Sequence, residues 1–327
     1  QRVPTHERIS YHSTPSIRKF ARPRRFFEPL SFRTRRLLQR RIIGDSRNKI
    51  WHSTYYTEQL DWEGPKVVTM VDAIHERFPE LFTEPRHEQL RIRMRRCLSS
   101  ADIVIAISET TKKDIVQIYE LDAARIRVIP LACSDNLVST ESNRLTEERS
   151  GNPPFFLYVG RRGAYKDFET ILTAMSLSSN VRNAQIVAVG PPATSRETER
   201  LKSLGLDDRV TMLNDVGDRQ LESLYRNAMA LLFPSLYEGF GIPLLEAMAC
   251  GCPIIASRIP STLEVARDCP IYFEAGNAEQ LAGIFDDVGT STRKWQRAEC
   301  GDEVSRQFSW AKTANLTLNV YRELLKG

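Results

Sequence analysis

Histidine and long apolar runs are scarce in this sequence, and their scarcity excludes several kinds of protein. The five histidines among the 327 residues all precede residue 88, and none stands at metal-ligand spacing from a cysteine, so we expect no zinc site. No apolar stretch approaches the roughly 18 residues that a membrane-spanning helix needs, and no signal-peptide pattern opens the chain. We therefore expect a cytoplasmic protein without a transmembrane segment.

Cysteine is also sparse, and its distribution predicts thiols rather than disulfides. The one close pair, Cys250 and Cys252, falls within apolar sequence at a predicted helix end. The other four are scattered along the chain: Cys97, Cys133, Cys269 and Cys300. We expect all six to be free, reduced and mostly buried, because isolated cysteines in a chain without secretion signals behave as small hydrophobic residues.

Positive charge is concentrated at the start of the chain. The formal net charge is +5, but residues 1–50 carry fourteen Lys or Arg against three acidic residues, so the remainder is acidic. Residues 17–47 combine three Arg-Arg pairs with four phenylalanines. We favour an anionic membrane surface as the partner of this segment, at the inner face of the membrane; a solvated arginine-rich face is the alternative. No nucleic-acid-binding module accompanies the charge, so no nucleic-acid partner is expected.

Residues 230–257 form the most informative stretch of the sequence. Two short apolar runs, 230–233 and 253–256, read as buried parallel strands. The helix between them is marked by Pro243 at its first turn and by Gly251 just past its end. The two glycines of the preceding loop allow close approach of a ligand to the backbone, and the helix N-terminus offers N–H groups to an anion. This loop is therefore expected to hold phosphate.

Two carboxylates bracket that loop, and together with it they form a recognisable motif. Glu238 precedes the glycines, and Glu246 lies eight residues further on, in the helix. Alone, this spacing would describe a surface acid and a favourable helix-dipole acid. The whole string Glu-Gly-Phe-Gly-Ile-Pro-x-x-Glu-Ala-Met-Ala-x-Gly closely resembles the nucleotide-sugar-binding signature of family 4 glycosyltransferases. The resemblance assigns Glu238 to the donor sugar, Gly239, Phe240, Gly241 and Ile242 to the diphosphate, and Glu246 to the ribose hydroxyls.

The resemblance implies a GT-B fold, an α/β architecture of two facing Rossmann-like domains. We expect an acceptor-binding domain over 1–140, a linker over 141–154, a nucleotide-sugar-binding domain over 155–308, and a helix over 309–327 that crosses back to the N-terminal domain. The β-α-β alternation over 102–129 and the amphipathic spacing of apolar residues over 310–325 agree with this division.

The N-terminal half departs from the family pattern at two points. The chain starts without the Gly-rich loop that many members have, and Val71 stands where many members have a histidine before the aspartate. The run 66–71 reads as a buried strand that delivers Asp72 to the edge of the sheet where ligands bind. Asp72 and His75 are the nearest polar candidates for a catalytic role. A structural role is the alternative for both, and His52 is a weaker candidate.

The second half begins with a strand at 155–159, which turns at Gly160 into a basic segment. Arg161 and Lys166 follow at the spacing of the family's diphosphate ligands, with Arg162 as a possible substitute for Arg161, and Asp167 is expected to cap the next helix. By resemblance, the backbone near Val216 meets the nucleobase; a plain helix-capping loop is the alternative.

The residues also suggest the chemistry. No Asp-x-Asp occurs, whereas metal-dependent glycosyltransferases use that motif to hold a divalent ion, so we expect a metal-independent enzyme. Fixed cations and helix N–H groups can stabilise the departing diphosphate instead. The resemblance implies transfer with retention. A front-face displacement, in which Glu238 orients the sugar hydroxyls, suits the site better than a nucleophilic carboxylate.

Segments HSTYY, VDAIHERFP and FSW are similar to those of bacterial polysaccharide mannosyltransferases of the family. The expected donor is therefore GDP-mannose, with a UDP-sugar second, and the expected acceptor is a glycan, in particular a lipid-linked one. Three alternatives stay open: an epimerase or phosphorylase on the same fold, a non-catalytic nucleotide-sugar-binding subunit, and a nucleic-acid binder that would explain only the first fifty residues.

Overall fold

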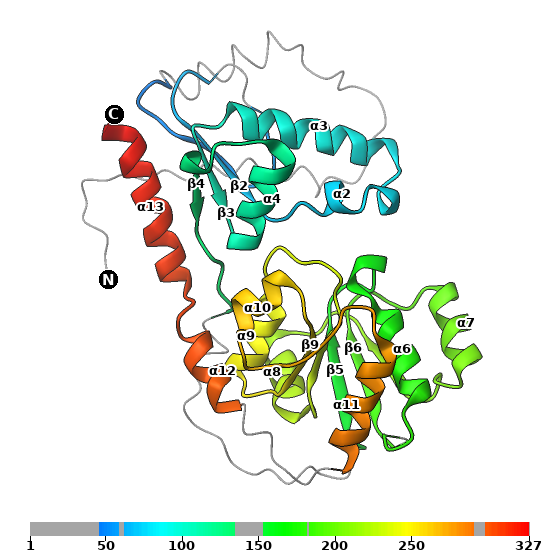
Figure 1. The fold of residues 1–327 in the computed structure, drawn as a ribbon. Coiled ribbons are helices and arrows are strands. Elements are labelled where there is room, and N and C mark those ends of the chain that lie inside the picture. The colour runs from blue at the N-terminus through cyan, green and yellow to red at the C-terminus, as the bar shows by residue number, and fades with distance from the viewer. Residues whose placement is uncertain (1–45, 59–61, 135–152, 182, 291–297, 327) are drawn as a thin grey trace, which may run out of the picture. The chain divides into compact units, whose positions relative to one another are not determined.

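Two parallel β-sheets with flanking helices make up the described part of the chain (Figure 1). The computed structural model describes residues 46–58, 62–134, 153–181, 183–290 and 298–326. Residues 17–45 of the basic segment and residues 141–152 of the predicted linker lie outside these ranges. Within them, no helix is both long and apolar enough to span a bilayer.

The N-terminal sheet has the order β1-β2-β3-β4, with every neighbouring pair parallel. Its strands are Trp51–Ser53, Lys66–Met70, Ile103–Ala106 and Ile126–Val128. Its helices are α2 (Ile74–Arg77), α3 (Pro85–Ser100) and α4 (Glu109–Tyr119), with 3-10 turns at Pro79–Leu81 and Ala123–Arg125. Alternate residues of β2 serve opposite faces: Val68 and Met70 pack with residues of α3 and α4, and Val67 packs on the other side.

The C-terminal sheet has the order β10-β9-β8-β5-β6-β7, again all parallel. In chain order its strands are Phe155–Val159, Gln185–Val189, Val210–Leu213, Leu231–Phe233, Ile254–Ser257 and Ile271–Phe273. The chain therefore starts in the middle of the sheet at β5, builds outward to β7, and returns to continue at β8 on the other side. This is the doubly wound Rossmann order.

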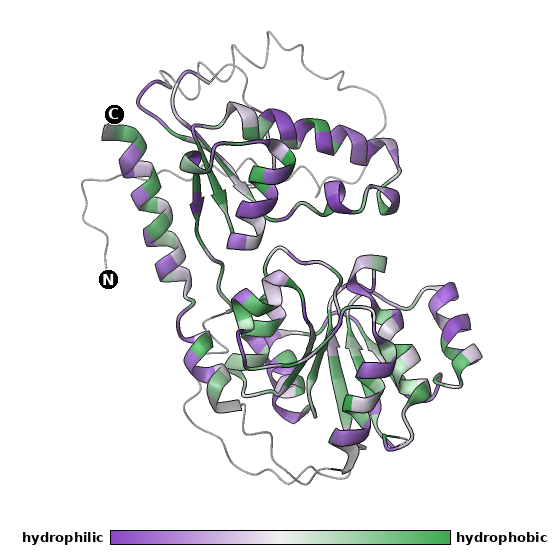
Figure 2. Ribbon diagram, in the orientation of Figure 1, coloured by the Kyte–Doolittle hydropathy of each residue, from purple (hydrophilic) through white to green (hydrophobic). Residues whose placement is uncertain are grey.

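Helices cover both faces of the C-terminal sheet. Its helical elements are the 3-10 turn Ala164–Lys166, α6 (Phe168–Leu177), α7 (Ser195–Leu204), α8 (Asp218–Asn227), α9 (Ile242–Ala249), α10 (Pro260–Ala266), α11 (Ala278–Thr290) and α12 (Ala298–Ser305). One core cluster joins the sheet to α6, α7 and α11, and a second joins it to α8, α9, α10 and α12. Figure 2 shows the strands coloured as hydrophobic, whereas α3 and α7 are mostly hydrophilic. Coverage on both faces explains why these strands read as continuous apolar runs.

The last helix, α13 (Trp310–Lys326), packs on the N-terminal sheet. Val320 is buried with Val67 and Ile105 on the sheet face opposite α3 and α4. His52 of β1 fixes the helix further, because its two ring nitrogens contact the hydroxyls of Tyr321 and Thr69. The crossing helix expected from the amphipathic C-terminus is therefore present, and His52 serves this packing.

The predicted elements agree with the structure apart from small shifts at their ends. The strand expected at 155–159 has these bounds, and the strands expected at 230–233 and 253–256 lie at Leu231–Phe233 and Ile254–Ser257. Helix α9 begins at Ile242, so Pro243 is its second residue, and Gly251 follows its end with φ +66°. Asp167 is the N-cap residue of α6, as predicted, and its carboxylate accepts a hydrogen bond from the Thr170 hydroxyl.

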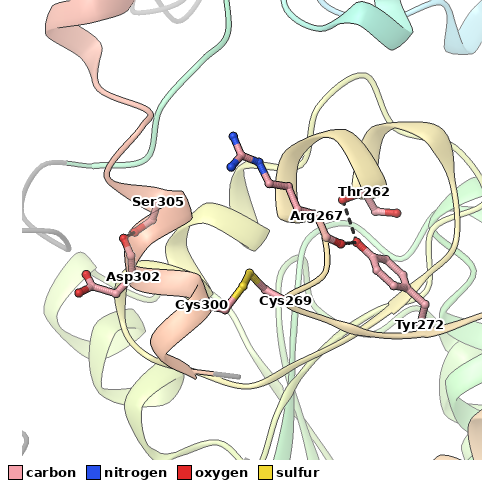
Figure 3. Close-up of a disulfide and its surroundings, with 7 residues drawn as sticks. All are labelled: Thr262, Arg267, Cys269, Tyr272, Cys300, Asp302 and Ser305. Carbon is pink, nitrogen blue, oxygen red and sulfur yellow. Dashed lines mark hydrogen bonds between the residues drawn. A yellow bond between two sulfur atoms is a disulfide. The ribbon is translucent and has the colours of Figure 1, made fainter. Parts of the chain in front are cut away.

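The prediction of six free cysteines is also wrong for one pair. Cys269, just after α10, and Cys300, in α12, form a disulfide (Figure 3). The pair lies 31 residues apart in sequence, and the chain makes β10 and α11 between them before α12 returns to α9. Periodicity along the sequence does not reveal such a return. Cys97, Cys133, Cys250 and Cys252 are buried and form no disulfide within the described part of the chain, as expected.

Reduction of this disulfide should lower the stability of the protein. Closing a loop of 31 residues is expected to contribute about 2–4 kcal/mol to the free energy of unfolding. Urea unfolding with and without reductant measures the effect, with a Cys269→Ser/Cys300→Ser variant as the control that should not respond to reductant. A wild-type midpoint unchanged by complete reduction would contradict the prediction.

His52 should make the fold sensitive to acid. Burial lowers the pKa of His52 from 6.5 to about 4, so the unfolded chain takes up a proton at a higher pH than the folded one. The contribution of this neutral imidazole is fully present above pH 6.5 and is lost as the pH falls towards 4, by at most about 3 kcal/mol. Melting temperatures of the wild type and His52→Gln between pH 4 and 7 measure it. The wild type should lose more stability than the variant over that range, and equal losses would argue against the assignment.

Candidate active site

Sheet order brings the two candidate phosphate-binding loops together. In a doubly wound sheet, ligands bind at the carboxyl ends of the strands where the chain reverses its direction of building, which here is between β5 and β8. The segment after β5 carries Gly160 to Lys166, and the segment after β8 carries Pro234 to Gly241. A backbone hydrogen bond of 2.8 Å, from Leu236 N–H to the Tyr165 carbonyl, joins the two segments.

An ion pair occupies the junction of these segments. The Lys166 ammonium donates to Glu238 Oε1, and the Ser235 hydroxyl donates to the same oxygen at 2.6 Å. Both charged side chains are largely buried, with 21% and 12% exposure. Lys166 also lies 5.5 Å from the centre of the Tyr165 ring. Two of the residues predicted for the donor site are therefore in direct contact.

The glycine loop leads directly into α9. Gly241, the N-cap residue of α9, has a φ of +115°, which favours glycine, and a Cβ added there would lie 2.9 Å from the Leu244 side chain. Ile242 is the first residue of the helix. Pro243 has no N–H, and the Leu244 N–H donates to the Gly241 carbonyl at 3.0 Å, so in the first turn the Ile242 N–H is left to meet a ligand. Phe240 is buried against Phe308, with ring centres 5.8 Å apart. The Phe240 side chain therefore anchors the loop in the core, and the backbone is left to meet a ligand.

Glu246 points to a different neighbour from Glu238. Its Oε2 accepts a hydrogen bond of 2.8 Å from the hydroxyl of Tyr225 in α8. Burial raises the pKa of Glu246, although the Tyr225 hydrogen bond acts in the opposite direction. This carboxylate thus lies between α8 and α9, and the loop containing Val216 precedes α8 at the carboxyl end of β7.

Asp72 lies close to the ion pair, although it belongs to the N-terminal sheet. Its Oδ1 accepts from the Ile74 N–H at 3.0 Å. Burial raises the pKa of Asp72, the Ile74 hydrogen bond lowers it, and the charges of Glu238 and Lys166 act in opposite directions. The backbone of Gly239 lies against Val71 and Asp72: a Cβ added at Gly239 would collide with the Val71 carbonyl oxygen and lie 3.0 Å from the Asp72 Cβ. The structure therefore groups Asp72, Lys166 and Glu238.

His75 is not part of that group. Its ring packs 4.2 Å from Phe82 and 5.2 Å from His87, measured between ring centres. Its Nδ1 is buried and has no hydrogen-bond partner. No hydrogen bond or ion pair joins His75 to Asp72, Lys166 or Glu238 in the described part of the chain.

The two arginines after β5 differ in their surroundings. Arg162 is held by Glu197 at 2.7 Å and by the carbonyls of Pro191 and Pro192, so it is not available as a substitute for its neighbour. Arg161 is exposed, and its carbonyl accepts from the Tyr158 hydroxyl. Gly160, with φ +143°, allows the close approach of this loop to Gly190. Of the two arginines, Arg161 is the one free to reach a ligand.

Several neighbours of the site were not singled out from the sequence. Ser235 and Tyr237 flank the signature and contact, respectively, Glu238 and the N-terminal sheet, while Tyr225 binds Glu246. The sequence signal that could have identified Ser235 and Tyr237 is their position directly before Glu238. A cavity of about 310 Å³ lies beside Glu238, and its lining includes Arg77, Phe78, Thr110, Asp114, Tyr237 and Ser261.

Comparison with known proteins identifies the family. The family described as Glycosyltransferase Family 4 matches residues 2–135, and the one described as Glycosyl transferases group 1 matches residues 139–300. The O-antigen chain mannosyltransferase RfbU of Salmonella typhimurium is 30% identical over 77% of this chain and 68% of its own length. The chain belongs to glycosyltransferase family 4.

Other relatives of this family 4 chain agree. O-antigen chain mannosyltransferase B of Escherichia coli is 27% identical over 91% of this chain and 81% of its own. Among solved structures, sucrose-phosphate synthase from Thermosynechococcus elongatus has a TM-score of 0.71 at 22% identity, covering 90% of this chain and 77% of its own. Anabaena HepE in complex with UDP-glucose has a TM-score of 0.63 at 20% identity, covering 79% and 72%. The GT-B fold and the glycosyltransferase class expected from the sequence are confirmed.

Close contact at Gly239 should be required for activity. A methyl group there would collide with the Val71 carbonyl, whereas one at Gly283 in α11 would meet nothing within 4 Å. We expect Gly239→Ala to lower glycosyl transfer at least about 100-fold, as a 1 Å displacement of a reacting group can, and Gly283→Ala to leave it unchanged. Initial rates with a confirmed donor are the measurement. Near-wild-type turnover of Gly239→Ala would show that this approach is not needed.

Proposed function

We propose that this enzyme transfers a mannosyl group, with retention of configuration, from GDP-mannose to a glycan acceptor, in particular a lipid-linked one. The observation that carries the proposal is the buried Lys166–Glu238 pair beside the N-terminus of α9. The mannosyltransferase names of the two bacterial relatives support the sugar. A UDP-sugar is the second candidate donor, because a solved structure of the same fold holds UDP-glucose.

Lys166, Arg161 and the Ile242 N–H at the start of α9 would bind the diphosphate. They provide positive charge and oriented dipoles where the leaving group gains negative charge. We assign leaving-group stabilisation to these protein groups and expect transfer to proceed without a divalent ion.

Donor binding would rearrange the ion pair. Lys166 now faces Glu238, and a diphosphate would compete for its ammonium group. The Glu238 carboxylate would then accept hydrogen bonds from the donor sugar hydroxyls, with the half-buried Asp72 beside it. As the bond between the anomeric carbon and the phosphate oxygen breaks, the acceptor oxygen would bond to the same face of the sugar, and its proton would pass to the leaving phosphate.

Val216 and Glu246 complete the proposed donor site. The loop at Val216 would meet the nucleobase, and Glu246, held by Tyr225, would accept hydrogen bonds from the ribose hydroxyls. Because burial raises the pKa of Glu246, ribose binding through an ionised carboxylate should weaken as the pH falls.

A donor screen followed by two substitutions tests the proposal. GDP-mannose should raise the melting temperature more than UDP-glucose or UDP-galactose, because a ligand that binds only the folded state stabilises it. Glu238→Ala and Lys166→Ala should each reduce transfer at least about 100-fold, whereas the exposed controls Glu199→Ala and Lys202→Ala should not. Addition of EDTA should leave the wild-type rate unchanged.

Three results would contradict the proposal. Stabilisation by UDP-sugars alone would exclude the GDP-mannose assignment. Retention of near-wild-type transfer by either site variant would exclude the assigned roles. Turnover of the donor without an acceptor to an isomeric nucleotide sugar would favour an epimerase.

A further inference from the structure

Tyr237 connects the Glu238 loop to the N-terminal sheet. Its hydroxyl accepts a hydrogen bond of 2.9 Å from the Ala73 N–H and donates one of 2.6 Å to Asp114 Oδ2. Tyr237 immediately precedes Glu238, and Ala73 immediately follows Asp72. One hydroxyl group therefore links the two segments that carry the candidate catalytic carboxylates.

The acceptor of the Tyr237 proton is itself fixed in place. Asp114, in α4, is 3% exposed, and its other oxygen, Oδ1, accepts from the guanidinium of Arg77. Both oxygens of Asp114 are thus occupied. The aromatic ring of Tyr237 also lies 6.1 Å from that of Phe78. Burial, together with the hydrogen bond to Asp114 and its charge, raises the pKa of Tyr237, which keeps the hydroxyl protonated and able to donate.

The backbone N–H of Ala73 depends on the Tyr237 hydroxyl for its hydrogen bond. Ala73 is fully buried, and the Tyr237 hydroxyl is the acceptor that the described structure provides for its N–H. A buried amide without a partner costs free energy, so the contact favours the arrangement in which the two loops meet. The loop that carries Glu238 has a second contact two residues after Tyr237, where the Ser108 hydroxyl donates a hydrogen bond of 2.6 Å to the Gly239 carbonyl. Loss of the Tyr237 hydroxyl should therefore loosen Glu238 without releasing the whole loop.

We propose that Tyr237 is a positioning residue: its hydroxyl holds the Glu238 loop against the Asp72 loop, so that Glu238 is correctly placed and water is kept from the donor during transfer. This role rests on the proposed transferase function. It differs from substrate binding, because Tyr237 acts through the backbone of Ala73 and the carboxylate of Asp114. A closed junction of this kind would favour transfer over hydrolysis of the donor.

The test compares Tyr237→Phe with Tyr119→Phe. Tyr119 is a matched control because its hydroxyl is buried and has no hydrogen-bond partner among the described residues. In Tyr237→Phe, hydrogen exchange at the Ala73 amide should accelerate at least 10-fold without any ligand. The kcat for transfer should fall about 10- to 100-fold, the Kd of the donor should change less than about threefold, and the fraction of donor lost to hydrolysis should rise. Tyr119→Phe should change none of these quantities.

Hydrogen exchange at Ala73 tests whether the Tyr237 contact exists, and the kcat with donor hydrolysis tests whether the contact positions Glu238. Unchanged exchange at Ala73 would overturn the contact whether or not transfer is observed. Accelerated exchange with an unchanged kcat and unchanged hydrolysis would overturn the positioning role. If Tyr237→Phe does not fold, Asp114→Asn replaces it, because an NH2 group then stands in place of one carboxylate oxygen, and either Arg77 or Tyr237 loses its acceptor. If no tested donor is turned over by the wild type, the proposed function fails, and exchange at Ala73 still decides whether the contact exists.

Discussion

The buried ion pair between Lys166 and Glu238 is the interaction on which the rest of the site depends. It joins the segment after β5 to the segment after β8 at the point where the sheet order reverses. Removing one partner of a buried pair leaves an uncompensated charge, which is far more costly than the net contribution of the pair itself. The ion pair therefore keeps the Lys166 ammonium and the Glu238 carboxylate in place in the unliganded protein. A donor diphosphate is an anion that can replace Glu238 as the partner of Lys166.

The surrounding structure serves to place these two side chains. Phe240 anchors the glycine loop in the core, and Gly241 turns the chain into α9. The N-terminal sheet contributes Asp72 through a backbone approach that only glycine at position 239 permits. On the far side of that sheet, α13 is fixed by His52 and Val320. Positioning of the carboxylates thus involves elements from both ends of the described chain.

Local sequence patterns predicted much of this arrangement, but they did not predict contacts between residues that lie far apart in the sequence. Apolar runs bounded by glycine and proline gave the strands of the C-terminal sheet, and the signature located Glu238 and Glu246. The pairing of Tyr237 with Asp114, 123 residues apart, follows from the fold and leaves no periodic trace in the sequence. The same reason explains the unpredicted Cys269–Cys300 disulfide. The sequence placed His75 shortly after β2, where it lies in α2, but the direction of its ring depends on Phe82 and His87.

A crystal structure of the enzyme with an intact nucleotide sugar, grown in the presence of EDTA, would test the central claim most directly. The account predicts that the diphosphate lies within hydrogen-bond distance of Lys166 Nζ and of the Ile242 N–H at the start of α9, while Glu238 has left Lys166 for a hydroxyl of the sugar. A diphosphate bound elsewhere, or a donor that binds only when a divalent cation bridges its phosphates, would contradict it.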